Sequence, residues 1–201
     1  MTILEIIAAI FGFLCVWFYI VRSVWSWPTG LVQVLLLIAV FYHAKLYADM
    51  ALHVIYVGLQ IFGWVAWQKS LRIAPSNTAG SEMIVVRSLS MQGNITCILV
   101  SIVLTIAFSS MLLKWTDAEL PIADSFVAAA SLVAQYLLAT RRLENWIYWI
   151  IIDTVGVGLF AYKELYPTAI LYALFWVMAI VGLVAWNRAA QQQHSGVTRS
   201  T

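Results

Sequence analysis

The chain contains an internal repeat long enough to form a whole membrane unit. Residues 22–69 align without a gap on residues 141–188, at a constant offset of 119. The matches go beyond apolar composition: Arg22 falls on Arg141, Trp27 on Trp146, Phe41 on Phe160, Gly63 on Gly182, and Val65-Ala66-Trp67 on Val184-Ala185-Trp186. Two copies of one membrane unit are typical of transporters, in which a site between similar halves is exposed to each side in turn.

The composition places the chain in a lipid bilayer. It is 63% hydrophobic and 10% charged, with a mean hydropathy of +0.91, which is incompatible with a soluble surface rich in charged side chains. The net charge of +2 comes without a basic cluster, so we expect no nucleic-acid partner. Cys15 and Cys97 lie in apolar segments without Cys/His ligand spacing, and we expect no disulfide, metal or cofactor.

Seven apolar stretches are long enough to span a bilayer, which needs about 20 residues. The first has Glu5 in place of a basic leader region, so we expect it to be a retained helix and not a signal peptide. The joints at 44–48 and 163–167 are very short, which predicts two antiparallel helical hairpins. We expect helices near Ile3–Val21, Pro28–Lys45, Ala48–Gln68, Gly93–Leu113, Ile122–Ala139, Asn145–Tyr162 and Thr168–Asn187.

The basic residues predict the orientation, because Lys and Arg beside spans are retained on the cytoplasmic side. One side has only Lys45, Lys114 and Lys163, whereas the other collects Arg22, Lys69, Arg72, Arg87, Arg141, Arg142, Arg188 and Arg199. We therefore expect a multi-pass membrane protein with its N-terminus outside and its C-terminus in the cytoplasm.

The fourth span has no counterpart in the repeat, and this explains the architecture. Three spans return the chain on the opposite side, so a second copy in the same orientation needs one extra crossing. We predict an all-α polytopic membrane protein of seven transmembrane helices, with two parallel three-helix repeats joined by an inverting fourth helix, similar to the SWEET sugar transporters. The predicted parts are a first repeat (1–68), a cytoplasmic loop with the linker helix and an external loop (69–121), a second repeat (122–188) and a cytoplasmic tail (189–201), in which residues 191–201 are expected to be disordered.

The richest candidate site lies at the start of the sixth span. Trp146, Trp149 and Asp153 have helical spacing that places two indoles and a carboxylate on one face. A carboxylate in a membrane costs about 3 kcal/mol and is tolerated chiefly beside a cavity or a partner, and aromatic faces attract cations. This face suits an organic cation, although Asp153 could instead form an interhelical hydrogen bond.

Other polar and aromatic residues could complete a central pocket. His53, Tyr56 and Gln60 share a face of the third span, and Tyr172 and Trp176 occupy the repeat positions of His53 and Val57. Interhelical hydrogen bonds are the structural alternative for the polar ones, including Gln135. We expect Asp124 to cap the N-terminus of the fifth helix. Interfacial anchoring is the alternative for the tryptophans, favoured for Trp25, Trp27, Trp67, Trp115 and Trp186.

At these residues the sequence resembles the PnuC family of vitamin transporters, whose best-known members import nicotinamide riboside. The resemblance covers most of residues 5–187. It rests on Trp27-Pro28-x-Gly30, Lys45-Leu46-Tyr47-Ala48, Phe62-Gly63-Trp64-Val65-Ala66-Trp67, Glu144-Asn145-Trp146-x-x-Trp149 and Leu165-Tyr166.

The resemblance implies a seven-helix core that carries one substrate by facilitated diffusion. It also implies that a cytoplasmic kinase traps the vitamin by phosphorylating it, and that a homotrimer is possible. Nicotinamide riboside has a cationic pyridinium ring and a ribose. Trp146, Trp149 and Tyr56 would suit the ring, and Asn145, Gln60, Gln135 and Asp153 the polar groups.

Several alternatives stay open on the sequence alone. Thiamine is carried by related proteins and is also a cation, so the same residues would suit it. A proton-coupled transporter would use Asp153 and His53 as a proton relay. A non-transporting scaffold is another alternative, but it would not account for Asp153 beside two tryptophans. An enzyme would need paired carboxylates, an activated nucleophile or a metal cluster, and we find none of these arranged in the sequence.

Overall fold

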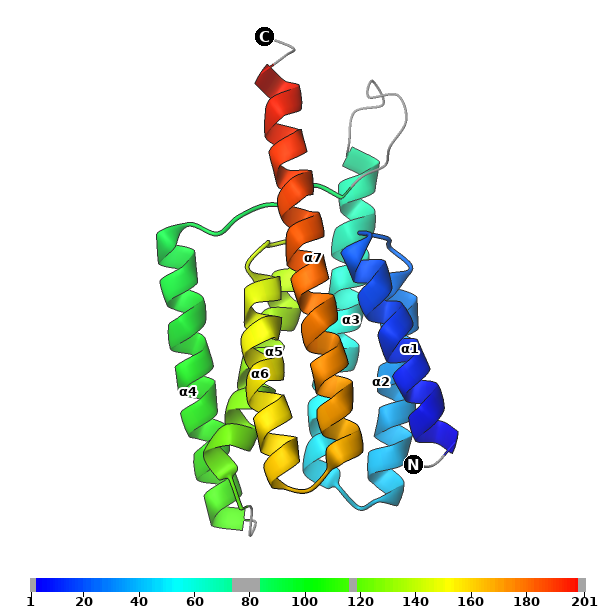
Figure 1. Cartoon of the computed structure of the whole chain (residues 1–201), viewed down its shortest axis with the longest axis vertical. Coiled ribbons are helices and arrows are strands. Elements are labelled where there is room, and N and C mark those ends of the chain that lie inside the picture. Colours follow the sequence, from blue (N-terminus) through cyan, green and yellow to red (C-terminus); the bar gives the residue numbers. More distant parts are fainter. Residues whose placement is uncertain (1–2, 74–83, 116–118, 199–201) are drawn as a thin grey trace. The chain divides into compact units, whose positions relative to one another are not determined.

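The computed structural model describes residues 3–73, 84–115 and 119–198, and these ranges form helices, with a non-helical segment at 84–90 before the fourth helix (Figure 1). Each helix is long and apolar enough to cross a membrane, which confirms the seven predicted spans. The helices are α1 (Ile3–Ile20), α2 (Ser26–His43), α3 (Tyr47–Ile73), α4 (Met91–Trp115), α5 (Pro121–Ala139), α6 (Asn145–Tyr162) and α7 (Tyr166–Thr198).

Two helices continue beyond their predicted ends. The tail from residue 191 was expected to be disordered, but α7 extends to Thr198, and α3 extends through Lys69 to Ile73. Extending an existing helix needs no new nucleus, and the alanine, arginine and glutamine residues that follow Asn187 are good helix formers. Pro75, Ser76, Asn77 and Gly80, expected in a linker between the halves, lie outside the described residues.

Contacts between residues divide the chain into two compact units. Unit 1 contains Met1–Val86, Ala139–Arg141 and Arg188–Thr201, and unit 2 contains Arg87–Leu138 and Arg142–Asn187. In unit 1, α2 packs against both α1 and α3 (Figure 1). In unit 2, α4 is grouped with α5, α6 and most of α7. The domain boundaries predicted from the repeat stay a prediction, as does the arrangement of two repeats around an inverting helix.

The same turn conformation ends four helices. Arg22, Lys45, Arg141 and Glu164 have positive φ angles of 58°, 58°, 62° and 58°. The backbone N–H that follows the left-handed residue bonds to a carbonyl five residues earlier, as from Ser23 to Phe18 (2.9 Å) and from Arg142 to Leu137 (2.8 Å). This is the Schellman arrangement, which usually has glycine at the left-handed position. Each pair of turns lies 119 residues apart, so the repeat is present in the local backbone.

An extended segment before α4, residues 87–90, is attached to the turn between α5 and α6. The N–H of Leu143 donates to the carbonyl of Arg87 (2.9 Å), and Arg142 Nη1 donates to the carbonyl of Ser88 (2.9 Å). The N–H of Leu89 donates to Oε1 of Glu144 (2.9 Å). These bonds join the start of α4 to the residue that precedes α6.

Candidate functional site

Asn145 is the first residue of α6 and is fully buried. Its Nδ2 donates to the carbonyl of Arg142 (2.6 Å). Its Oδ1 is buried and has no hydrogen-bond partner among the described residues. A buried amide oxygen without a partner costs about 1–3 kcal/mol, so this atom is suited to receive a donor from a ligand or a water molecule.

Trp146 packs between α6 and α7. Its side chain is 2% exposed, and its ring meets that of Trp186 edge to face, with centroids 5.7 Å apart. A Cβ added at Gly182 would lie only 2.6 Å from Cε3, Cη2 and Cζ2 of the indole. The absence of a side chain at Gly182 therefore allows the indole to lie directly on the backbone of α7.

Unit 1 repeats this packing at the equivalent residues. Trp27 is fully buried, and its ring meets that of Trp67 edge to face at 5.3 Å. A Cβ at Gly63 would overlap the ring of Trp27. Trp27, Trp67 and Trp186 are therefore core residues, and the interfacial role expected for them is wrong, whereas Trp25 and Trp115 are exposed. In each unit a glycine on the neighbouring helix leaves room for the indole ring, so the ring packs inside the unit and not at a membrane interface.

Trp149 and Asp153, by contrast, are replaced by residues of different chemistry in the first repeat. Trp149 is half-buried and packs against Ala130, Ala134 and Ile152 of a small core between α5 and α6. Gly30 occupies the equivalent position in unit 1, where Gln60 and Cys15 take the space that its Cβ would fill. The two units thus share their Trp146-type packing and differ at Trp149.

Asp153 is a buried carboxylate that has no neutralising partner among the described residues. It is 3% exposed and makes no hydrogen bond or ion pair with the residues that the structure describes. Val34 is its equivalent in the first repeat. Since a buried carboxylate is costly unless it is paired, the interhelical hydrogen bond considered for Asp153 is absent from the described part of the chain.

The other predicted residues of unit 2 have different surroundings. Gln135 is buried on α5. Tyr172 packs on Phe160, with ring centroids 4.9 Å apart, and on the backbone at Gly156. Trp176 is 37% exposed, and its Nε1 donates to Thr154, which is itself exposed (3.0 Å). Of this set, Trp176 therefore lies nearest to an outer surface.

The predicted residues of unit 1 form an aromatic and polar cluster. Gln60 is buried and accepts a hydrogen bond from the hydroxyl of Tyr19 (3.0 Å), a partner that the sequence did not indicate. The ring of His53 lies tilted against Phe41, with centroids 4.9 Å apart, and meets Tyr56 edge to face at 5.6 Å. Its Nδ1 lies 2.8 Å from the carbonyl oxygen of Asp49. The bond from Tyr19 is an interhelical hydrogen bond of the kind considered for Gln60, whereas the contact of His53 with Asp49 lies within α3.

Asp124 differs from its prediction. It lies inside the first turn of α5 and does not precede the helix. Its carboxylate accepts from Lys163 Nζ, which follows α6, at 2.7 and 2.8 Å. The expected capping role is therefore replaced by an ion pair between the start of α5 and the end of α6.

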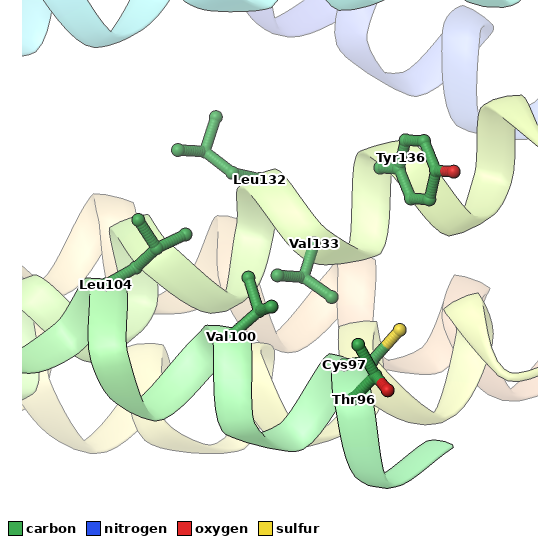
Figure 2. Close-up of a pocket in the computed structure, with 7 residues that line it drawn as sticks. All are labelled: Thr96, Cys97, Val100, Leu104, Leu132, Val133 and Tyr136. Carbon is green, nitrogen blue, oxygen red and sulfur yellow. The ribbon is translucent and has the colours of Figure 1, made fainter. Parts of the chain in front are cut away.

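An apolar groove lies between α4 and α5, with a volume of about 270 Å³ (Figure 2). Its lining contains none of the predicted site residues. The lining residues are Thr96, Cys97, Val100, Leu104, Leu132, Val133 and Tyr136.

Comparison with known proteins gives consistent results. The family model described as "Nicotinamide mononucleotide transporter" matches residues 2–188. The nicotinamide riboside transporter PnuC of Neisseria mucosa is 28% identical, over 94% of this chain and 73% of the relative. The riboflavin/roseoflavin transporter RibM of Streptomyces davaonensis is 22% identical, over 82% of this chain and 75% of the relative. A crystal structure of the vitamin B3 transporter PnuC has a TM-score of 0.77 at 27% identity, and covers 94% of this chain and 82% of that one.

Proposed function

The chain belongs to the PnuC family of membrane vitamin transporters, and from this premise we propose that its substrate is nicotinamide riboside. The relatives named as nicotinamide riboside transporters support this substrate. The observation that carries the proposal is that α6 presents Trp149 and Asp153 one helical turn apart, at positions where the first repeat has Gly30 and Val34.

The chemistry of this pair matches a cationic vitamin. The pyridinium ring of nicotinamide riboside would stack on the half-buried indole of Trp149, a contact worth about 0.5–2 kcal/mol. The carboxylate of Asp153 would balance the positive charge of the ring. This carboxylate is buried and has no neutralising partner among the described residues. The unpaired Oδ1 of Asn145 would accept a donor from the amide or the ribose. Trp146 is too fully covered by its own packing to offer a ring face, so we assign it a supporting role.

We further propose facilitated diffusion through an inner membrane, with the N-terminus outside. A downstream kinase would then trap the vitamin by adding a negative charge. The sequence places one carboxylate deep in a span, whereas a proton relay usually needs a chain of titratable groups. A proton-coupled carrier would stop concentrating substrate when the pH gradient is collapsed, whereas a facilitator would equilibrate its substrate equally well with or without the gradient. The homotrimer stays a prediction.

Calorimetric titration of the purified protein with nicotinamide riboside, thiamine and riboflavin would test the substrate. We expect tight binding of nicotinamide riboside alone. Tight binding of thiamine alone would preserve the cation site and change the vitamin. Riboflavin is neutral, so its selective binding would contradict the role assigned to Asp153. Riboflavin is included because the relative from Streptomyces davaonensis is named a riboflavin/roseoflavin transporter.

A further inference from the structure

The contact between Gly182 and Trp146 has a consequence for the proposed substrate site. Cε3 and Cζ2 are opposite atoms of the six-membered ring of the indole, and both lie 2.6 Å from the place where a Cβ at Gly182 would be. Cη2 lies at the same distance. The missing Cβ therefore points at the centre of the ring face, so a methyl group there would displace the whole ring.

The ring has little room to move away. Ordinary contacts of a Cβ with carbon begin near 3.4 Å, so the indole would have to retreat by roughly 1 Å. The side chain of Trp146 is only 2% exposed, and the centroid of the Trp186 ring lies 5.7 Å from that of Trp146. A packed interior resists such an insertion, and the strain passes to the backbone that carries the ring.

That backbone is the first turn of α6. Trp146 follows Asn145 directly, and Trp149 lies three residues further along the same helix. A shift of the indole therefore moves the unpaired Oδ1 of Asn145 and the indole of Trp149 together. We propose that Gly182 is a positioning residue for substrate, which fixes the start of α6 by allowing Trp146 to lie on α7. This inference rests on the substrate site proposed above.

The chain supplies matched controls. Gly63 faces Trp27 in unit 1, where an added Cβ would meet the outer edge of the ring more closely than at Gly182, but the residue at the position of Trp149 there is Gly30. Gly158, on α6 itself, has open space where its Cβ would be. Gly63→Ala therefore reproduces the packing damage without acting on α6, and Gly158→Ala reproduces the chemical change without a clash.

The experiment measures the Kd for nicotinamide riboside and the Tm for purified wild type and variants. We expect Gly182→Ala to raise Kd by at least about tenfold. We expect Gly63→Ala to lower Tm at least as much as Gly182→Ala, because its overlap with the ring is closer, but to leave Kd within about threefold. We expect Gly158→Ala to change neither Tm nor Kd. A Gly182→Ala protein that binds like wild type, or a Gly63→Ala protein weakened equally, would overturn the proposal.

A double variant separates positioning from general damage and also serves if Gly182→Ala does not fold. Trp146→Phe removes the outer ring, so the methyl group of Gly182→Ala fills the vacated space. The Kd of the double variant should lie within about threefold of that of Trp146→Phe alone, which is a non-additive cycle. Additive losses would refute the coupling. A wild type that binds none of the three vitamins would overturn the proposed function, and this inference with it.

Discussion

At the scale of single residues, the internal repeat separates structural side chains from candidate ligand contacts. Trp27 and Trp146 have the same neighbours in their own units, a glycine and a second tryptophan. A role that is duplicated in this way is most simply packing. Trp149 and Asp153 have Gly30 and Val34 as their equivalents, and a substrate that binds one half differently from the other needs such differences.

Asp153→Asn is expected to weaken binding and to stabilise the fold. The amide keeps the size of the side chain but removes an unpaired charge that burial makes costly. We expect Kd for nicotinamide riboside to rise by about tenfold or more, while Tm stays level or rises. Calorimetry and thermal unfolding in detergent would measure the two effects.

Asp124→Asn is the matched control for this substitution. It removes the half-exposed ion pair with Lys163, which is worth about 0–1 kcal/mol, and should leave Kd unchanged. If Asp153→Asn instead lowered Tm and kept wild-type affinity, Asp153 would be a structural residue.

At the scale of elements, the four helix ends with left-handed residues carry removable strain. An L-residue in this conformation costs about 1–2 kcal/mol relative to glycine, although glycine also gains entropy in the unfolded chain. Glu164 is exposed at such a position, after α6. Glycine at this site fits the conformation that the turn requires.

Glu164→Gly should therefore raise stability by up to about 1 kcal/mol without affecting substrate affinity. Glu164→Ala is the control, since it removes the same side chain but keeps a Cβ at positive φ. Thermal unfolding of both variants would measure the difference. Equal Tm values for the glycine and alanine variants would mean that the turn is not strained.

One of the three hydrogen bonds that attach residues 87–90 to the start of α6 is made by a carboxylate. Glu144 Oε1 accepts from the N–H of Leu89 at 2.9 Å. Glu144→Ala leaves this N–H without its acceptor, at a cost of about 1–3 kcal/mol, whereas Glu144→Gln keeps a carbonyl oxygen there. We expect faster amide hydrogen exchange at Leu89 in the alanine variant only. Unchanged exchange in Glu144→Ala would show that the other two hydrogen bonds of the segment are sufficient.

At the scale of the whole molecule, the orientation is open to a direct test. Lys45 follows α2 and Gln191 lies near the end of α7, and both side chains are exposed. In a background with Cys15 and Cys97 replaced by alanine, an impermeant thiol reagent added to intact cells should label Lys45→Cys but not Gln191→Cys. The reverse pattern would invert the predicted topology. Labelling of both after lysis is the control for accessibility.

The sequence by itself determined the number of spans, the bounds of α6 and the repeat that relates the turns. These features are local: a span is recognised from the transfer free energy of about 20 consecutive residues, and a repeat from matched identities. The carboxylate of Asp153 could also be recognised from the sequence, because a charged residue within an apolar segment stands out without knowledge of its neighbours in space.

The tertiary structure decided which tryptophans pack and which stay available. Trp27 and Trp146 are buried because Gly63 and Gly182 face them from another helix. The residue pattern of a single helix does not predict which residue of another helix will face it. The same holds for the bond from Tyr19 to Gln60 and for the ion pair of Lys163 with Asp124. Periodicity shows which face of a helix is apolar, but the partner of a side chain is set by how helices distant in sequence pack together.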